Sequence, residues 1–207
     1  MSTKDFLKKI KDEDIEYVDV RFTDTRGKLQ HVTIVSDLVD EDFVEEGFMF
    51  DGSSIAGWKS IEASDMKLML DTDTAYVDPF YAEKTICVHC SVVEPDTGEA
   101  YERDPRGTAQ KAEAYLKASG IGDVAYMGPE AEFFLFDNVK FSNSINKVSY
   151  EVDASDASWN TDTDYEMGNM GHRPGLKGGY FPVNPTDEAQ DLRAEMLSTM
   201  KRLGMKV

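Results

Sequence analysis

Hydrophobic and polar residues alternate along two short stretches near the start of this chain, at residues 18–22 and 32–34. Successive side chains of a strand point to opposite faces, so each stretch predicts a strand with one buried face. Between the two stretches, the segment Asp24-Thr25-Arg26-Gly27 favours a turn. The pattern therefore predicts a β-hairpin as the first part of the fold.

The rest of the first hundred residues also indicates a sheet with little helix. Residues 40–46 are expected to form a short acidic helix, and Phe48 to Trp58 a glycine-containing loop. Further strands are expected at 67–71 and 85–94, followed by a turn at Pro95-Asp96-Thr97-Gly98. A compact sheet is the expected result.

The pattern changes at Asp104 and Pro105, which are typical of a helix N-cap and a first helical residue. The expected helix ends at Gly120. The charge balance changes here too: residues 1–104 carry 25 acidic and 11 basic side chains, and residues 105–207 carry 15 and 11. We expect a domain boundary at this point.

The later half has less regular patterning. Residues 125–137 favour a strand, residues 138–178 show no clear period and are expected to form a long loop, and a helix follows Asp187. Residues 205–207 look like a strand that has just begun. We therefore expect the 207-residue sequence to be a truncated part of a longer protein.

Composition excludes several classes of protein. With 40 acidic and 22 basic residues, the formal charge of −18 argues against binding to duplex nucleic acid or to an anionic membrane. No apolar run approaches the ~20 residues of a membrane span, and the N-terminus has no signal-peptide core. The hydrophobic content of 41% argues against disorder. The chain is expected to be folded and cytoplasmic.

Glu130-Ala131-Glu132, within the segment predicted as a strand, is the strongest chemical signal. Residues two apart share one face of a strand, so two carboxylates would project together beside the apolar run 133–136. Mutual repulsion and lost hydration would both be relieved by a hard divalent cation such as Mg²⁺ or Mn²⁺. The alternative is a strand end that reaches solvent, with neither glutamate binding a metal.

Two glycine-containing segments can present functional groups. In Asp51-Gly52-Ser53-Ser54 a short loop can aim a carboxylate, and in 178–183 paired glycines let the backbone approach a ligand. Ordinary turns are the alternative for both, and His172 in the long loop is a further candidate. Cys87-Val88-His89-Cys90 has no second cysteine pair to complete a tetrahedral metal site, so core packing is expected there.

Four segments carry a resemblance to a known family. They are Phe50–Ile55 with Trp58, Gly128–Phe136, Gly171–Pro174 and Lys177–Val183. In order and spacing they resemble the signature segments of bacterial type I glutamine synthetases, and the resemblance runs from about residue 4 to the end.

The resemblance implies an α+β fold, in which an N-terminal β-grasp domain at 14–98 precedes the first part of a catalytic α/β domain at 105–207. It implies a ligase that forms glutamine from glutamate, ammonia and ATP through a γ-glutamyl phosphate intermediate. It also implies a homododecamer of two hexameric rings.

The resemblance assigns roles to particular residues. Glu130 would hold a cation on the nucleotide side, and Glu132 a cation on the glutamate side. Asp51 would act across a subunit boundary and take a proton from bound ammonium. Ser54 and Tyr180 would complete that ammonium pocket.

Trp58 would lie near the nucleotide of the adjacent subunit. The family's remaining metal ligands and phosphate-binding arginines lie beyond Val207, so this segment alone is expected to be inactive. Two other interpretations stay open: a non-catalytic β-grasp interaction module with an acidic face, and a related ligase acting on bulkier amines such as polyamines.

Overall fold

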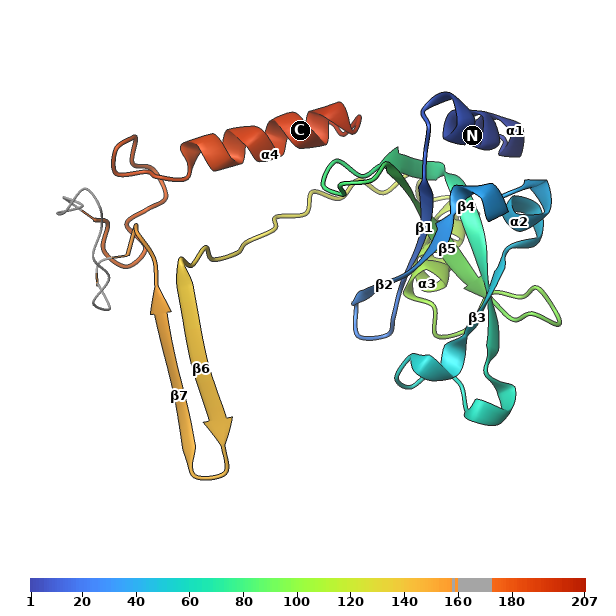
Figure 1. Ribbon diagram of the computed structural model, residues 1–207, viewed down its shortest axis with the longest axis horizontal. Coiled ribbons are helices and arrows are strands. Elements are labelled where there is room, and N and C mark those ends of the chain that lie inside the picture. Colours follow the sequence, from blue (N-terminus) through green and yellow to red (C-terminus); the bar gives the residue numbers. More distant parts are fainter. Residues whose placement is uncertain (158, 160–172) are drawn as a thin grey trace. The chain divides into compact units, whose positions relative to one another are not determined.

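The structure, a computed structural model, describes residues 1–157, 159 and 173–207. Within it the chain divides into two compact units, Met1–Met127 and Gly128–Val207. The helices and strands of the first unit are, in chain order, α1 (Thr3–Asp12), β1 (Tyr17–Thr23), β2 (Leu29–Val35), α2 (Glu41–Glu46), β3 (Phe48–Asp51), β4 (Asp65–Val77), β5 (Thr85–Val93) and α3 (Pro105–Ser119) (Figure 1). Short 3-10 turns lie at Ser36–Leu38, Gly52–Ser54 and Ile61–Ala63.

A five-stranded sheet with the order β2-β1-β5-β4-β3 forms the centre of the first unit. Strands β1 and β5 run parallel, and every other neighbouring pair is antiparallel. The predicted hairpin is confirmed, because β1 pairs with β2 from Tyr17↔Val35 to Thr23↔Leu29. Strand β3 was not expected: Phe48 and Phe50 alternate inward at the edge of the sheet, and the neighbouring glycines had suggested a loop.

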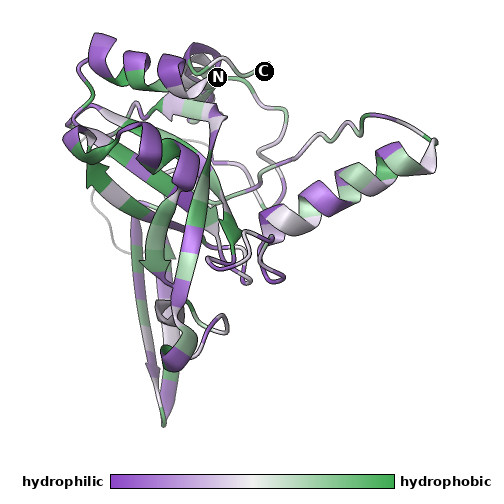
Figure 2. Cartoon of the chain, turned by 90° about the vertical axis from the view of Figure 1, so that its right-hand side faces the viewer, coloured by the Kyte–Doolittle hydropathy of each residue, from purple (hydrophilic) through white to green (hydrophobic). Residues whose placement is uncertain are grey.

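One face of this sheet carries the hydrophobic core. The residues predicted to face inward on β1 are all buried, and they pack with Phe6 and Ile10 of α1. Figure 2 shows hydrophobic and hydrophilic residues alternating along the strands. The period of two in the sequence therefore has its expected cause, a sheet with one face packed on the hydrophobic core.

The opposite face of the sheet holds a buried charge network centred on Asp19, which has no exposed surface. Its carboxylate is bonded by the side chains of Arg21 at 2.7 Å, His31 at 2.6 Å and Thr33 at 2.7 Å. The Arg21 guanidinium also donates to Tyr76 at 2.7 Å and Asp78 at 3.1 Å. Each charge is thus paired, as burial in a protein requires.

Helix α3 begins and ends as the sequence predicts. Asp104 accepts a hydrogen bond from the backbone N–H of Arg106 at 3.0 Å, and Gly120 ends the helix with a left-handed φ of +69°. Asp104 is buried and also accepts from the backbone N–H of Val92 at 3.0 Å. One carboxylate therefore serves both the helix and strand β5.

The second unit contains the strands β6 (Asn138–Ser144) and β7 (Lys147–Asp153) and the helix α4 (Gln190–Arg202). The prediction of an unstructured loop from residue 138 was wrong, since β6 and β7 form a seven-pair antiparallel hairpin. The helix begins at Gln190, not directly after Asp187, whose carboxylate accepts from Ala189 N–H and bonds Arg193.

The strand predicted at 125–137 is absent from the described residues, where 124–136 form no strand. Its aromatic side chains are exposed, including Tyr126 and Phe134. A strand needs a hydrogen-bonded neighbour and a cover for its apolar faces, and the described residues supply neither here. Residues 205–207, expected to begin a strand, are likewise irregular.

Two further observations concern the whole described chain. The α+β fold is confirmed, with a sheet and packed helices in one unit and a hairpin and helix in the other. The domain limits 14–98 and 105–207 stay a prediction, and α3 belongs to the first compact unit. None of the described helices has both the length and the apolar character needed to cross a bilayer.

Candidate functional site

Asp51 lies where the edge strand β3 ends and a 3-10 turn, Gly52–Ser54, begins. Its Oδ1 accepts hydrogen bonds from the backbone N–H of Ser53 at 2.9 Å and from the Ser53 hydroxyl at 2.6 Å. Its Oδ2 accepts from the Ser54 hydroxyl at 2.7 Å. The hydrogen bonds from Ser53 and then Ser54 hold the pKa of the Asp51 carboxyl below its usual range, so Asp51 is ionised at neutral pH.

The backbone around Asp51 leaves no room for a side chain at Gly52. A Cβ built there would lie 2.4 Å from Cγ of Met66 and 3.0 Å from the carbonyl oxygen of Ser64. The same glycine donates its N–H to that Ser64 oxygen at 2.7 Å, which fastens the turn to the start of β4. Gly52 therefore sets how closely the Asp51 turn approaches the sheet.

We expect Gly52→Ala to lower the free energy of unfolding by about 2 kcal/mol, because the added methyl group overpacks against buried Met66. Denaturant unfolding of this chain measures the loss. Gly175→Ala is the matched control, since nothing lies within 4 Å of the Cβ position there. Equal stabilities for the two variants would contradict this account of the turn.

Trp58 anchors the loop that follows. Its ring is 5% exposed and packs against Phe22, Phe50 and Tyr101, with centroid distances of 5.5, 6.2 and 5.2 Å. The indole nitrogen has no hydrogen-bond partner among the described residues. The ring thus lies inside the first unit, and its predicted place near the nucleotide of an adjacent subunit stays a prediction.

Polar contacts hold the same loop on its outer side. Arg103 donates to the carbonyl oxygen of Gly57, and Lys59 forms an ion pair with Glu94 at 2.7 Å. The Lys59 ammonium also lies 5.1 Å from the ring centroid of Tyr101. The loop that carries Asp51 is therefore fixed at both ends by contacts with its own unit.

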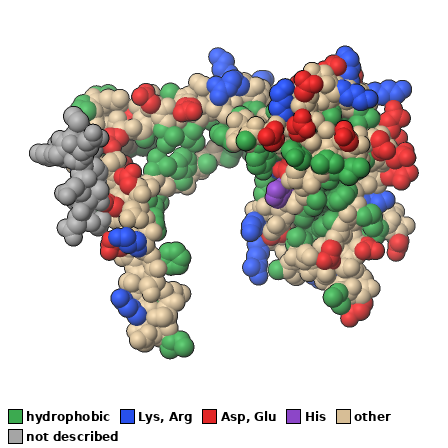
Figure 3. Space-filling view, in the orientation of Figure 1, with side chains coloured by type: hydrophobic (Ala, Val, Ile, Leu, Met, Phe, Trp, Pro, Cys, Tyr) green, Lys and Arg blue, Asp and Glu red, His purple; other side chains and the backbone are tan. Residues whose placement is uncertain are grey.

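The surroundings of Asp51 are acidic. Asp65 lies directly opposite Asp51 in the β3–β4 pair, and both residues are exposed. Facing like charges on neighbouring strands are destabilising unless a cation or water separates them. Figure 3 shows further acidic side chains over the first unit. This edge of the sheet is suited to attract a small cation.

The other predicted site residues belong to the second unit. Glu130 and Glu132 are exposed in an irregular segment, so the expected common strand face is not formed. Tyr180 is 87% exposed and stacks edge-on against Phe181 at 4.7 Å. No three His, Cys, Asp or Glu side chains of the described residues are close enough to hold a metal ion. His172 lies outside the described residues.

The cysteines near the middle of the sheet are structural. Cys87 and Cys90 are buried, as the sequence predicts for core residues. Burial raises the pKa of each thiol to about 12. Both are therefore protonated at neutral pH and are not nucleophiles.

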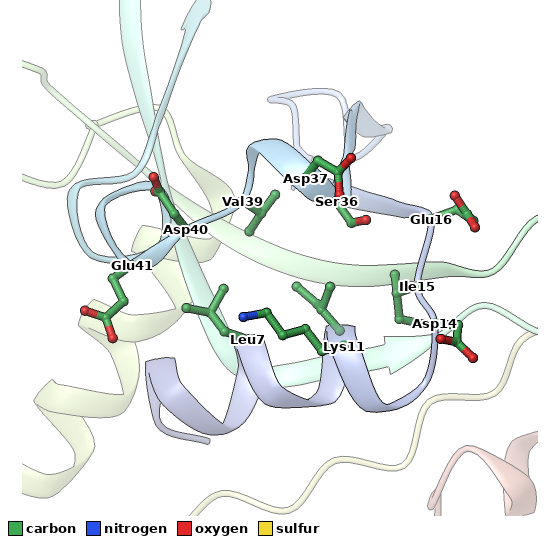
Figure 4. A pocket seen from close by; sticks show the side chains of 11 residues that line it. Leu7, Lys11, Asp14, Ile15, Glu16, Ser36, Asp37, Val39, Asp40 and Glu41 are labelled. Carbon is green, nitrogen blue, oxygen red and sulfur yellow. The ribbon is translucent and has the colours of Figure 1, made fainter.

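A groove of about 710 Å³ separates α1 from the chain leading into α2 (Figure 4). Leu7 and Lys11 line it from α1, and Val39 lines it from the other side. Its rim is acidic, with Asp14, Glu16, Asp37, Asp40 and Glu41. None of the predicted site residues lines this groove.

Comparison with known sequences identifies the family. A model described as "Glutamine synthetase, beta-Grasp domain" matches residues 14–95, and one described as "Glutamine synthetase, catalytic domain" matches residues 102–207. The chain belongs to the glutamine synthetase family. It is 76% identical to a glutamine synthetase of Cereibacter sphaeroides over 98% of its length, and 72% identical to one of Rhodobacter capsulatus over 100%.

The chain spans less than half of these glutamine synthetases, 44% of the first and 47% of the second. It is also similar in structure to a glutamine synthetase of Plasmodium falciparum, with a TM-score of 0.85 at 21% identity, covering 100% of this chain and 41% of that one. That likeness supports the β-grasp arrangement of the first unit.

Within this glutamine synthetase fold, the structure brings Asp51 and Ser54 of one turn into direct contact. Their predicted place in an ammonium pocket completed by Tyr180 stays a prediction. Sequence reasoning missed Ser53, which makes two of the three hydrogen bonds to Asp51. The signal was available, because an aspartate often bonds the backbone and side chain two residues onward.

Proposed function

We propose that this chain forms part of a ligase that makes glutamine from glutamate, ammonia and ATP, with ADP and phosphate as the other products. ATP first phosphorylates the γ-carboxylate of glutamate. The nitrogen of ammonia then bonds to the γ-carbon while the carbon–oxygen bond to phosphate breaks. The family supports this reaction, and the turn that presents an ionised Asp51 is the structural observation that carries it.

Asp51 and Ser54 offer what an ammonium ion needs. Ammonium has only N–H donors, and Oδ2 of Asp51 and the Ser54 hydroxyl oxygen lie 2.7 Å apart as neighbouring acceptors. Because the Ser54 proton is already donated to Asp51, its oxygen presents lone pairs to any further partner. The pair therefore binds the cation, and Asp51 then accepts its proton so that neutral ammonia can attack.

The low pKa of Asp51 favours binding of the ammonium cation but disfavours acceptance of its proton. A carboxylate is several pK units less basic than an amine, so proton transfer in an exposed pocket is unfavourable. Loss of hydration when the pocket is covered would raise the pKa of Asp51 and favour the transfer. The proposed cover is Tyr180 of an adjacent subunit, in a cytoplasmic homo-oligomer of two hexameric rings.

Glu130 and Glu132 are proposed to bind Mg²⁺ or Mn²⁺. Their oxygen ligands fit hard cations, although two carboxylates are fewer than such an ion requires. Phosphate oxygens, water and further protein ligands would complete the coordination. The bound ion would neutralise charge on the transferred phosphoryl group. The part of the two glutamates is to fix that ion by contributing these oxygens.

We expect Glu132→Ala in the full-length enzyme to raise the Mg²⁺ or Mn²⁺ concentration for half-maximal activity at least about tenfold. Glu195→Ala removes a carboxylate from α4 of the same unit and is the control. A metal titration of both variants measures the difference. Superimposable titrations would remove Glu132 from the proposed site.

Assay of the full-length protein tests the function itself. ADP release should require glutamate and ammonium together, with one glutamine formed per ATP. Turnover with a polyamine in place of ammonium would favour the related ligases. Absence of any glutamate-dependent ADP release, in a protein that assembles normally, would favour a non-catalytic interaction module.

A further inference from the structure

Asp51 has four acceptor positions, two on each carboxylate oxygen, and its neighbours use them unequally. Oδ1 receives both donors of Ser53, the backbone N–H at 2.9 Å and the hydroxyl at 2.6 Å. Oδ2 receives the Ser54 hydroxyl at 2.7 Å, and the backbone N–H of Ser54 contributes weakly to the carboxylate. Among the described residues Oδ1 thus accepts two short hydrogen bonds and Oδ2 one, so Oδ2 is the oxygen more open to a further donor.

The two donors of Ser53 also fix the orientation of the carboxylate. Three hydrogen bonds, two on one oxygen and one on the other, favour one rotamer of the Asp51 side chain, and the Ser53 hydroxyl makes the shortest of them. The backbone donor is held by the 3-10 turn Gly52–Ser54.

We propose that Ser53 is a positioning residue for amine activation, which occupies Oδ1 of Asp51 with two hydrogen bonds and so makes Oδ2 the oxygen that receives the ammonium proton. This inference rests on the proposed function. In the step it serves, one N–H bond of ammonium breaks, the proton moves to Oδ2, and the electron pair stays on nitrogen. Ser54 keeps its hydrogen bond to Oδ2 and orients the resulting ammonia.

Ser53 also lowers the basicity of Asp51, and its hydrogen bonds are the largest cause of the lowered pKa. The enzyme would thus gain a fixed geometry at the cost of proton affinity. Loss of the hydroxyl should raise the pKa of Asp51 and still slow the reaction, because orientation is lost. If Ser53 acted only by lowering the basicity of Asp51, loss of its hydroxyl would instead speed the proton transfer.

The test combines three variants of the full-length enzyme: Ser53→Ala, Ser53→Thr and Asp51→Asn. Ser53→Ala should lower kcat/KM for ammonium about tenfold, with the KM values for glutamate and ATP within about twofold of wild type. Ser53→Thr keeps a hydroxyl and should recover most of the loss. Ser60→Ala is the control, since Ser60 is an exposed serine of the same loop without a capping hydrogen bond.

A double-mutant cycle separates positioning from folding. If Ser53 acts through Asp51, Ser53→Ala should change kcat/KM for ammonium less than about twofold when Asp51 is already asparagine. The positioning role alone would be overturned if Ser53→Ala lowered kcat/KM for ammonium equally with aspartate or asparagine at position 51. It would also be overturned if Ser53→Ala had the same kinetics as the Ser60→Ala control. Normal ammonium kinetics in Asp51→Asn would overturn the proposed function as well.

A measurement on the present chain needs no catalysis. Three-bond Hα–Hβ couplings of Asp51 should report one χ1 rotamer in wild type and in Ser53→Thr, and averaged values in Ser53→Ala. A single rotamer in all three chains would overturn the inference whatever the kinetics show. Averaging confined to Ser53→Ala would support the geometry independently of the reaction.

Discussion

Replacing Asp51 by asparagine is expected to lower ammonium-dependent turnover of the full-length enzyme by about a hundredfold or more, the usual scale for losing a positioned proton acceptor. Asparagine keeps the size of the side chain and one acceptor oxygen, which can serve either the Ser53 donors or the Ser54 hydroxyl. It removes the negative charge that attracts ammonium and the basicity that receives the proton. The KM for ammonium should therefore rise and kcat should fall, while nucleotide binding is preserved.

Hydroxylamine separates charge attraction and deprotonation from simple damage to the loop. It is a neutral nucleophile at the assay pH, so it needs neither an anionic pocket nor a proton acceptor. The Asp51→Asn enzyme should therefore retain a larger fraction of wild-type activity with hydroxylamine than with ammonium. Equal losses with the two amines would show that Asp51 supports the loop and does not accept the proton.

Removing the buried carboxylate of Asp19 should have the largest effect on stability. Asp19→Ala leaves the half-buried Arg21 with one fewer anion and removes the carboxylate bonded by His31 and Thr33. Loss of one member of a buried ion pair costs about 3 kcal/mol or more. Urea unfolding of this chain, followed by tryptophan fluorescence, measures the change at pH 7.

The effect of Asp19 should depend on pH in a defined direction. Burial alone would raise the pKa of Asp19, but hydrogen bonds from His31, Arg21 and Thr33 outweigh it and lower the pKa. A carboxyl whose pKa is lowered by folding stabilises the protein above its ordinary pKa of about 3.9, and this contribution is lost as the pH falls through the folded-state value. The difference in the free energy of unfolding between wild type and Asp19→Ala should therefore become smaller as the pH falls below about 4.

Asp37→Ala is the control for this experiment, because Asp37 is exposed and lies outside the network. Its effect at pH 7 should stay within about 0.5 kcal/mol. A loss for Asp19→Ala as small as that of the control would mean that the network contributes little net stability. A loss that does not vary with pH would assign the effect to packing and not to charge.

The parts of the fold that the sequence predicts correctly are those fixed by local rules. The hairpin follows from a period of two around a turn, and α3 follows from Asp104, Pro105 and Gly120 at its ends. The strand predicted at 125–137 failed for the opposite reason. Its aromatic residues satisfy the pattern of a buried strand, but pairing and cover depend on distant residues that a local pattern does not contain.

The candidate site follows less directly from the sequence. The contact of Asp51 with Ser54 is a short-range hydrogen bond within one turn, whereas the resemblance had only placed both residues in one pocket. The structure buries the ring of Trp58 against Phe22, Phe50 and Tyr101, and no pattern in the sequence indicated these contacts. Its assignment to a place near the nucleotide of an adjacent subunit came from resemblance alone and stays a prediction.

The carboxylate of Asp104 couples the opening of the end of β5 to the opening of the start of α3, because it is hydrogen-bonded to both elements. Because the amides of Val92 and Arg106 bond to its two oxygens, neither amide can reach solvent by fraying of its own element while that carboxylate stays buried. Hydrogen–deuterium exchange at both amides is then governed by one opening event. Bending between β5 and α3 therefore requires the hydrogen bonds of Asp104 to Val92 and Arg106 to break.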